Sequence, residues 1–458
     1  MLPSQVTVAV VGGGPAGFMA AISAAEALRA AGQPVSILVL EATAEPLHKV
    51  RISGGGRCNV THACWDPQQL VNHYPRGRGA LRGPFTQFAP ADCVDWFARH
   101  GLELVEEADG RLFPRSNRSS SVVDCLRQVA RRVGVSLVTG APVQSVSRAA
   151  QGAFELTLRD GGRLGCQRIV LATGSHPSGH RIAVALGHSL VAPVPSLFSL
   201  ALGPAGLQDL AGVSMDPVEL ELLPPREASP NPRRRQGGHR QRGAVLITHR
   251  GLSGPATLRL TAFAARDLKA WGYRAQLRVD WTGGLGVAGL EALFAQARQH
   301  QARRTLASWR PWPGLARRLW WRLLEEAGLA ASGEQAIRWA DLPRPAQQRL
   351  IEALLSGRYA VVGRGPFGEE FVTAGGVPVG EVNLTSLESR RCAGLQLVGE
   401  LLDVDGVTGG FNFQHCWTSG WLAGQALQRA LELSSQHGES DNGARDNQLS
   451  QRVGGGST

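Results

Sequence analysis

Three glycines near the start of the chain have the spacing of a nucleotide-binding turn. Gly12, Gly14 and Gly17 follow an apolar run over residues 6–11 and precede a helix expected over residues 15–31. In such a strand-to-helix turn, the first glycine permits the tight bend, the second lets the backbone approach a pyrophosphate, and the third lets the helix pack on the strand. The N–H groups at the start of the helix would then face the phosphates.

An acidic residue follows the next predicted strand. Glu41 closes an apolar run over residues 35–40, about 20 residues beyond the glycines, where dinucleotide-binding folds place the carboxylate that binds a ribose hydroxyl. A glycine-rich turn without a ligand is the alternative. The succession of strand, glycines, helix, second strand and acid favours a bound dinucleotide.

A second glycine-rich segment, RISGGGRCNVTH over residues 51–62, follows this strand. Its three consecutive glycines stand beside Arg57, Cys58 and Asn59. A loop of this kind can present backbone N–H groups to a phosphate or a flavin edge, and Arg57 can add a charge-assisted hydrogen bond. Because ligands bind beyond the carboxyl ends of parallel strands, the position of the loop favours cofactor contact over a simple turn.

Cys58 and Cys64 suggest an alternative in which a cysteine pair exchanges electrons with a flavin. The C-x5-C spacing puts the two side chains about 120° apart on a helix, because each residue turns about 100°. A disulfide also needs Cα atoms within about 7 Å of each other. We therefore favour a mechanism without a dithiol.

Two further segments resemble functional motifs, but their context does not support them. Gly284, Gly286 and Gly289 repeat the glycine spacing without a buried strand before them or a second strand closed by an acid after them, so we expect the start of a helix. The Trp-rich segment over residues 309–326 could contact a membrane or a nucleic acid, but its helical apolar spacing favours core packing. No cluster of His, Asp or Glu has the spacing of a metal site.

The composition is that of a folded protein in a reducing compartment. The 458 residues are 43% hydrophobic and 19% charged, which favours several folded domains. Seven scattered cysteines without a C-x-x-C pair indicate the cytoplasm, and we expect neither a secretory signal nor a membrane span. The net charge of +11 could attract nucleic acid, an anionic membrane or an acidic substrate, although a basic solvated surface is the simpler interpretation.

The pattern along the chain predicts an α/β protein with a doubly wound sheet that is interrupted by an insertion. A basic segment over residues 228–243 is expected at the tip of a hairpin within this insertion. The predicted parts are a first Rossmann-like part (1–192), a β-rich domain (193–287), a helical lobe (288–356), a return segment of the β-rich domain (357–367), a second Rossmann-like part (368–433) and a disordered tail (434–458).

Seven motifs between residues 8 and 424 together carry a family resemblance. The chain resembles the BaiN/YhiN-like FAD-binding oxidoreductases, the group that includes aminoacetone-oxidase-like enzymes. The resemblance implies a split Rossmann-like FAD-binding domain, an inserted β-rich barrel-like domain and a small helical lobe. The motifs are GGGPAGFMAA, SGGGRCNVTH, LATGSHP, LGHSLVAPVPSLFSL, LITHRGLSGPATLRL, TAGGVPVGEVNLTSLESR and GELLDVDGVTGGFNFQHCWTSGWLAG.

The residues that the resemblance assigns to FAD form groups along the cofactor. At the adenosine and pyrophosphate end they are Gly14, Pro15 and Ala16 for the pyrophosphate, Glu41 for the ribose, Val143 for adenine through its backbone, and Thr173 and Gly174 beneath the nucleotide. Toward the flavin they are Lys49, Arg57, Cys58 and Asn59, then Glu400 for a ribityl hydroxyl, and Gly410, Phe411 and Asn412 at the start of the last helix. The N–H groups of that helix can stabilise the negative charge that gathers on a reduced flavin.

The chain departs from the family pattern at two places. The segment ATGSHPSGH is shorter than the usual glycine-rich turn after ATG, which changes one wall of the predicted site. His415 and Cys416 stand where relatives commonly have Trp and Ala. His415 is a candidate proton donor, because an unperturbed imidazole titrates near neutral pH, and a packed structural histidine is the alternative.

We expect a cytoplasmic FAD-dependent oxidoreductase that acts on a small-molecule substrate, with NAD(P)H as the transient reductant. An oxygen-using oxidase of small, aminoacetone-like amines is the alternative within enzymes. A flavin-containing RNA-binding or tRNA-modifying protein is the alternative from another class, suggested by the charge and by the segment RRRQGGHRQR.

Overall fold

The structure is a computed structural model, and it describes residues 2–33, 35–149, 152–204, 207–225, 238–329, 336–365 and 372–453, with side chains in the last range only up to residue 432. The chain forms two compact units. Unit 1 contains Met1–Pro193 and Gly375–Thr458, and unit 2 contains Val194–Ala374. Unit 1 is therefore split in sequence by unit 2, and each unit is described separately below.

The core of unit 1 is a sheet whose central strands are parallel. Strands β6, β2, β1 and β9 are hydrogen-bonded in that order, β18 pairs β9 in parallel, and β8 and β7 extend the sheet from β9 as an antiparallel meander. The central strands are apolar and buried, as parallel strands covered on both faces must be. Their bounds are β1 (Gln5–Val11), β2 (Ile37–Leu40), β6 (Ser136–Val138), β7 (Val143–Arg148), β8 (Phe154–Leu158), β9 (Arg163–Leu171) and β18 (Leu395–Leu397).

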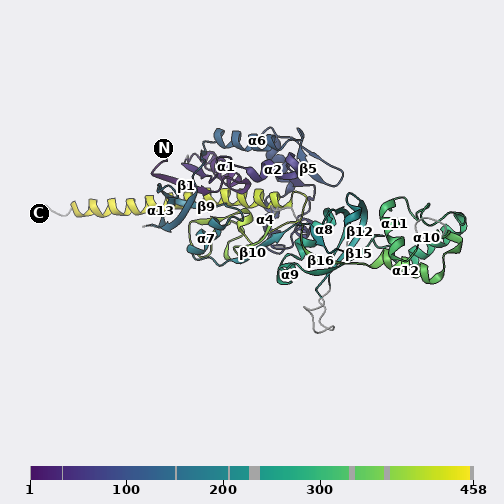
Figure 1. The fold of residues 1–458 in the computed structure, drawn as a ribbon. Coiled ribbons are helices and arrows are strands. Elements are labelled where there is room, and N and C mark those ends of the chain that lie inside the picture. Colours follow the sequence, from purple (N-terminus) through teal and green to yellow (C-terminus); the bar gives the residue numbers. More distant parts are fainter. Residues whose placement is uncertain are drawn as a thin grey trace. The chain divides into compact units, whose positions relative to one another are not determined.

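Helices α1 (Pro15–Ala30) and α13 (Phe411–Val453) lie side by side although almost the whole chain separates them; in Figure 1 they are the purple helix after β1 and the long yellow helix. Glycines make the close approach possible. A Cβ at Gly420 would lie 2.5 Å from the Ala16 carbonyl oxygen, and one at Gly424 would lie 2.6 Å from the Ala24 nitrogen. The two ends of the sequence are thus packed together directly behind the glycine turn.

The remaining elements of unit 1 are short and surround the sheet. A small antiparallel sheet has the order β3-β5-β4. The bounds are β3 (Thr61–His62), β4 (Leu104–Glu106), β5 (Arg111–Pro114), α2 (His48–Gly56), α3 (Pro67–Leu70), α4 (Arg82–Gln87), α5 (Pro90–Arg99), α6 (Ser119–Arg132), α7 (Pro177–Ala185) and the 3-10 turns η1 (Val71–His73), η7 (Val379–Glu381) and η8 (Gly399–Leu401).

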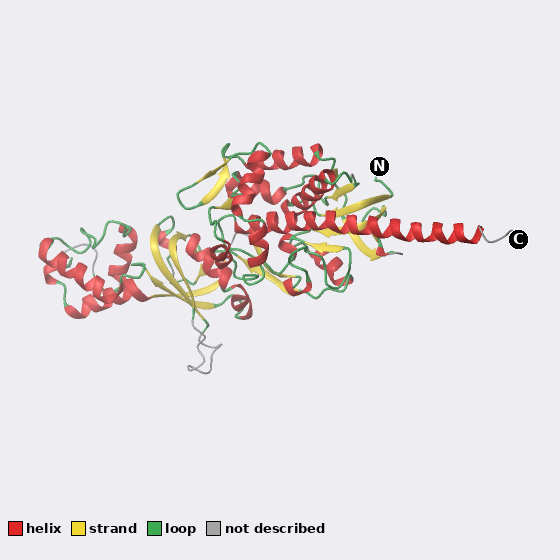
Figure 2. Ribbon diagram, turned by 180° about the vertical axis from the view of Figure 1, so that it is seen from behind, coloured by secondary structure: helices red, strands yellow, loops and turns green. Residues whose placement is uncertain are grey.

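Unit 2 contains a closed antiparallel barrel, which confirms the predicted β-rich insertion. The strands follow the order β11-β14-β13-β12-β15-β16, and Figure 2 shows them as yellow arrows with helices in red. Alternating side chains of β15 and β16 point into the core, as the pattern of period two requires. The bounds are β11 (Leu200–Leu202), β12 (Ser214–Leu223), β13 (His239–Thr248), β14 (Gly251–Ser253), β15 (Ala275–Asp280), β16 (Gly357–Arg364), η3 (Gln208–Leu210), α8 (Pro255–Phe263) and α9 (Ala265–Ala270).

The helical lobe is also present, inserted between β15 and β16. It consists of α10 (Gly286–His300), α11 (Arg317–Glu326), α12 (Arg344–Ser356) and the 3-10 turn η6 (Trp339–Asp341). Trp320 of α11 is fully buried and stacks on Trp339 with ring centroids 6.4 Å apart. The Trp-rich segment therefore packs a core, and the second glycine motif begins α10 after a barrel strand, as the sequence context indicated.

The chain passes between the units through β10 (Val191–Ser196) and β17 (Val372–Gly376), which pair with each other. Unit 1 ends at Pro193 and resumes at Gly375. The basic segment over residues 228–243 is described only from residue 238, where it leads into β13. Among the described helices, none has the length and apolarity that a membrane crossing requires.

The C-terminal region differs from the sequence expectation. The sequence predicts a disordered tail over residues 434–458, whereas the structure continues α13 to Val453, and residues 454–458 lie outside the described part. The expectation rested on the lack of an apolar period, which reports on packing rather than on backbone conformation. A helix that is already formed by packing can extend through a proline-free segment without a new nucleation step.

Candidate cofactor site

Four strand ends meet in one row at the carboxyl edge of the sheet in unit 1. The parallel registers align Leu40 with Val11, Val11 with Leu171, and Leu171 with Leu397. Each of the four strands continues directly into a predicted cofactor segment at this edge. These segments are the turn at Gly12, the acid Glu41, the stretch Ala172–Gly174 and the η8 turn with Glu400.

The glycine turn has the geometry that the fingerprint requires. Gly12 has φ +112°, and a Cβ there would lie 2.4 Å from the Ala172 carbonyl oxygen, while a Cβ at Gly17 would lie 2.1 Å from the Gly12 carbonyl oxygen. At Gly14, in contrast, a Cβ would meet no atom within 4 Å, and no side chain caps the start of α1 there. The turn is tightly packed on the protein side and open in front of the helix N-terminus, where a pyrophosphate can approach.

Glu41 lies across the turn from α1. Its Oε2 accepts a hydrogen bond from the Gly13 N–H at 2.8 Å, and its Oε1 accepts from the N–H and the hydroxyl of Thr43, each at 2.8 Å. A carboxylate has about four acceptor positions, so one remains for a ribose hydroxyl. The Glu41 carbonyl also accepts from the Ala141 N–H, which brings the segment before Val143, the predicted adenine contact, beside this acid.

Glu400 and Lys49 form an ion pair at the same edge, with Lys49 Nζ 2.5 Å from Glu400 Oε2. Gly399, with φ +66°, lets the η8 turn approach α1, because a Cβ there would lie 2.8 Å from the Ala16 Cβ. A Cβ at Gly174 would lie 3.6 Å from Glu400 Oε2. The structure therefore brings four predicted residues together in one cluster, namely Ala16, Lys49, Gly174 and Glu400.

On the segment that follows β9, two buried polar atoms have no hydrogen-bond partner among the described residues. They are the Thr173 hydroxyl oxygen and Nε2 of His180 on α7. Burial lowers the pKa of His180, and the charge of Glu400 acts in the opposite direction. Sequence reasoning included Thr173 but missed His180, whose only signal is its place in the segment after ATG.

The start of α13 meets β3, which brings residue 59 beside residue 410. Gly410 has φ +90°, and a Cβ there would lie 2.7 Å from the Thr61 backbone. The Asn59 amide bridges the two segments, since its NH2 donates to the Thr61 carbonyl at 2.9 Å and its oxygen accepts from the Gly410 N–H at 3.0 Å. The predicted flavin-side residues Asn59 and Gly410 are therefore neighbours.

Phe411 and Asn412 hold the first turn of α13 in place. The Asn412 side chain exchanges two hydrogen bonds with the backbone of Gly406, each at 2.8 Å. The Phe411 ring packs against both the His62 and the His73 ring, with centroids 4.7 and 4.2 Å away, and the two histidine rings lie 6.0 Å from each other. This aromatic stack was missed by sequence reasoning, because no local pattern joins His62, His73 and Phe411.

Arg57 and Cys58 are both in contact with other protein groups, and their cofactor role stays a prediction. The Arg57 guanidinium pairs with Glu107, donates to Asn117 Oδ1 at 2.5 Å and lies 3.9 Å from the Phe113 ring centroid. Cys58 is fully buried with φ +60°, and burial raises the pKa of its thiol to about 12. Cys58 and Cys64 are both unbridged.

His415 and Cys416 both contact the η8 turn. The His415 Nε2–H donates to the Gly399 carbonyl at 3.2 Å, and the Glu400 N–H donates to the Cys416 sulfur. Burial lowers the pKa of His415 to about 4, and its Nδ1 is a buried atom without a partner among the described residues. A neutral imidazole that holds Gly399 favours a positioning role over proton donation.

The residues at this edge fit FAD. The uncapped helix start, the open space at Gly14, the remaining acceptor position of Glu41 and the unpartnered Thr173 hydroxyl lie at segments that a dinucleotide would contact in succession. Within this arrangement, Gly12, Gly14, Pro15, Ala16 and Gly17 would hold the pyrophosphate, and Glu400 with the start of α13 would hold the ribityl and flavin part.

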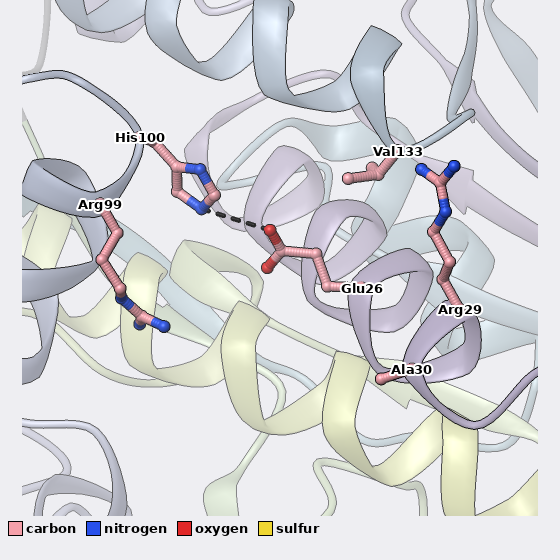
Figure 3. Close-up of a pocket in the computed structure, with 6 residues that line it drawn as sticks. All are labelled: Glu26, Arg29, Ala30, Arg99, His100 and Val133. Carbon is pink, nitrogen blue, oxygen red and sulfur yellow. Dashed lines mark ion pairs between the residues drawn. The ribbon is translucent and has the colours of Figure 1, made fainter.

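An open hollow of about 500 Å³ lies elsewhere in unit 1 (Figure 3). His100 Nε2 lies 3.2 Å from Glu26, and its Nδ1 accepts from Arg132 at 2.6 Å, so both ring nitrogens have partners. None of the predicted cofactor residues lines this hollow. The lining residues are Glu26, Arg29, Ala30, Arg99, His100 and Val133.

Comparisons with known proteins agree with a flavoprotein. The family described as HI0933-like protein Rossmann domain matches residues 6–426. A 3-dehydro-bile acid delta(4,6)-reductase of Clostridium scindens is 31% identical over 433 residues, which are 92% of this chain and 98% of that protein. A ribosomal RNA dihydrouridine synthase of Escherichia coli is 28% identical over 430 residues, which are 91% of this chain and 97% of that protein.

Among solved structures, the 3-ketosteroid delta1-dehydrogenase of Sterolibacterium denitrificans has a similar fold, with a TM-score of 0.50, 12% identity, and coverage of 93% of this chain and 100% of that chain. This likeness concerns the fold alone. The family assignment rests on two observations. The family matches most of the sequence, and the structure places the glycine turn, Glu41 and Glu400 at one edge of the sheet. The chain belongs to the HI0933-like, or BaiN/YhiN-like, family of FAD-binding Rossmann proteins and is a flavoprotein oxidoreductase.

Proposed function

We propose that this protein uses FAD to reduce a carbon–carbon double bond conjugated to a carbonyl group, with NAD(P)H as the source of electrons. The observation that carries the proposal is the chemistry shared by two relatives that match over more than 90% of the chain. A 3-dehydro-bile acid with delta(4,6) unsaturation and a uridine both contain an electron-poor C=C bond next to C=O. Addition of a hydride and a proton across that bond is the common reaction.

The residues of the site support this proposal. FAD, when bound, supplies two-electron hydride chemistry, so the protein has to provide position and field. The backbone N–H groups at the start of α13 can stabilise negative charge, because that helix end carries partial positive charge. Asn412 and the Asn59 bridge hold this helix start, and the Lys49–Glu400 pair holds the predicted ribityl contact.

Anaerobic stopped-flow measurements test the proposal. The purified protein is mixed with NADH or NADPH while the oxidised flavin absorbance is followed, and the reduced protein is then mixed with a 3-oxo steroid acid that carries the 4,6-diene. We expect NAD(P)H to bleach the flavin band and the dienone to restore it, with a product that has gained two hydrogen atoms. The saturated 3-oxo steroid acid is the matched control and should leave the flavin reduced.

The amine-oxidase alternative predicts the opposite electron flow. Small amines of the aminoacetone type would then bleach the flavin, and oxygen would restore it with release of hydrogen peroxide. The reductase proposal would be contradicted if amines bleached the flavin band and if conjugated carbonyl compounds, including a uridine-containing RNA, did not reoxidise the reduced flavin. If the gently purified protein contained no FAD and took up none when it was added, both the reductase proposal and the amine-oxidase alternative would be wrong.

A further inference from the structure

The charge of the chain is concentrated in unit 2. Counted over the sequence, residues 194–374 contain 24 Lys and Arg against 15 Asp and Glu, a net +9, whereas unit 1 contains 24 against 22, a net +2. Unit 2 therefore holds most of the chain's +11 although it is the smaller unit. A solvated basic surface without a specific role would not require this separation from the cofactor unit.

One face of the barrel displays this charge in a row across adjacent strands. The registers align Arg240 of β13 with Glu221 of β12, Glu221 with Arg278 of β15, and Arg278 with Arg358 of β16. Glu221 is buried between Arg240 at 2.8 Å and Arg278 at 2.9 Å, while the Arg240 side chain remains 58% exposed. Three guanidinium groups thus accompany a single acid over about 15 Å, the width of four strands.

The same outer face of β16 continues to a second basic position beside an aromatic ring. Arg358, Val362 and Arg364 are exposed on this strand, and the Arg364 guanidinium lies 5.0 Å from the Tyr273 ring centroid. Lys269 approaches the same ring at 5.8 Å. Tyr273 is partly buried and also packs edge-on against Phe198, with ring centroids 5.8 Å apart, at the edge of the row.

We propose that this surface of unit 2, defined by Arg240, Arg278, Arg358 and Arg364 and called the basic barrel face, binds RNA. The proposal rests on the proposed function and names its substrate class, because uracil in RNA contains the conjugated C=C–C=O group. Planar guanidinium groups bind phosphates with two parallel hydrogen bonds, and several in a row match a phosphodiester backbone better than a single anion. An aromatic ring beside them suits an unpaired base.

A membrane of anionic lipids is the other polyanion that this charge could meet. The basic barrel face is a pleated sheet with only small exposed apolar side chains, Ala360 and Val362, between Arg358 and Arg364 of β16. Membrane-surface segments instead join their cations to a continuous apolar face that enters the lipid. The barrel side chains that could form such a face, including Leu277, Val279 and Val361, are buried in the core.

Binding of a labelled RNA tests the inference without any turnover. Fluorescence anisotropy is measured with the full-length FAD-bound protein and a uridine-rich single strand of about 16 nucleotides, between about 50 and 200 mM salt. The double variant Arg358→Ala/Arg364→Ala should bind on the order of tenfold more weakly, with a slope of log affinity against log salt that is shallower by about 1.4. These two arginines are chosen because neither is an ion-pair partner of the buried Glu221.

Two further variants separate a binding surface from a folding defect. Arg131→Ala/Arg159→Ala removes the same charge from exposed positions of unit 1 and should leave both affinity and slope close to those of the parent. Glu221→Gln removes the acid within the row and should tighten binding severalfold, a gain that misfolding could not produce. The FAD content of each variant shows that unit 1 is intact.

Equal weakening by the unit 1 and unit 2 double variants would overturn the inference, as would an affinity that does not respond to salt. Sedimentation with phosphatidylserine vesicles that depends on Arg358 and Arg364, without RNA binding, would assign the face to membranes instead. Because these readouts involve no reaction, they are independent of the dienone experiment. RNA binding could therefore fail while double-bond reduction stands, and the reverse.

Discussion

At the scale of single residues, we propose that the Glu41 carboxylate serves the protein and a ligand together. Two of its hydrogen-bond donors, Gly13 and Thr43, belong to turns that follow neighbouring strands. The acid therefore fixes the glycine turn while one acceptor position remains for a ribose hydroxyl. Its identity could be predicted from sequence because strand length and helix length set its distance from the glycines.

Replacing this acid should weaken FAD binding. In Glu41→Ala, loss of a hydrogen bond to a charged acceptor costs about 1.5–3 kcal/mol, which corresponds to roughly 10-fold to 150-fold in dissociation constant. The dissociation constant is measured from the quenching of flavin fluorescence when FAD is titrated with the apoprotein. Glu45→Ala, in the exposed loop after the same strand, is the control and should bind FAD like the parent. Indistinguishable affinities for the two variants would exclude the predicted ribose contact.

His415 should make the protein less stable in mild acid. Its folded-state pKa is about 4, below the ordinary value of 6.5, so the unfolded chain binds the extra proton first. The stability linked to the neutral imidazole is complete above about pH 6.5 and is lost as pH falls toward 4, roughly 2 kcal/mol of unfolding free energy between about pH 7 and 5.

Urea unfolding at about pH 7 and pH 5 measures this loss. In His415→Gln, the loss of stability on acidification should be smaller than in the parent, because the amide does not titrate. His48→Gln replaces an exposed histidine and should show the same loss as the parent. If His415→Gln is as acid-sensitive as the parent, the imidazole is not held neutral by burial.

At the scale of elements, the close contact of α1 and α13 depends on glycine. At Gly424 a Cβ would lie 2.6 Å from the Ala24 nitrogen and 2.7 Å from the Ala20 carbonyl oxygen, both backbone atoms that cannot move alone. Gly424→Ala should therefore lower the free energy of unfolding by about 1–3 kcal/mol, as overpacking does.

A second helical glycine provides the matched comparison. At Gly83 of α4 a Cβ would meet no atom within 4 Å, so Gly83→Ala should be neutral or stabilising by up to about 1 kcal/mol through helix propensity alone. Thermal unfolding of both variants measures whether each substitution raises or lowers the stability. Equal effects at the two positions would show that α1 and α13 tolerate separation.

The elements that could be predicted from sequence are those specified by local pattern. The strand, glycine turn, helix and acid of residues 6–41 and the start of α10 at Gly286 follow from periodicity and turn chemistry. The Asn59 bridge to Gly410 and the contact of the Phe411 ring with His62 and His73 could not be predicted, since they join segments about 350 residues apart through tertiary packing. The helical extension to Val453 was missed because apolar periodicity reports on packing only.

At the scale of the whole molecule, every residue assigned to FAD belongs to unit 1, on both sides of the insertion. FAD should therefore stabilise unit 1 alone. At about 100 times the dissociation constant, ligand binding adds about 2.7 kcal/mol, which raises the melting temperature of a unit of this size by about 5 °C. Differential scanning calorimetry of the apoprotein, with and without FAD, should show one transition that moves and one that does not.

The Glu41→Ala variant serves as the control in this experiment, because the same FAD concentration should then move the first transition less. A single transition that shifts as a whole would mean that the two units unfold together. In that case the cofactor would stabilise the insertion as well as the sheet that binds it.

The pairing of β10 with β17 has a consequence for how this family can change. A Cβ at Gly375 would lie 2.7 Å from the Ala192 carbonyl oxygen, so the points where the chain leaves and re-enters unit 1 are adjacent. Replacement of the whole stretch between these two points would therefore leave the register of the parallel sheet unchanged.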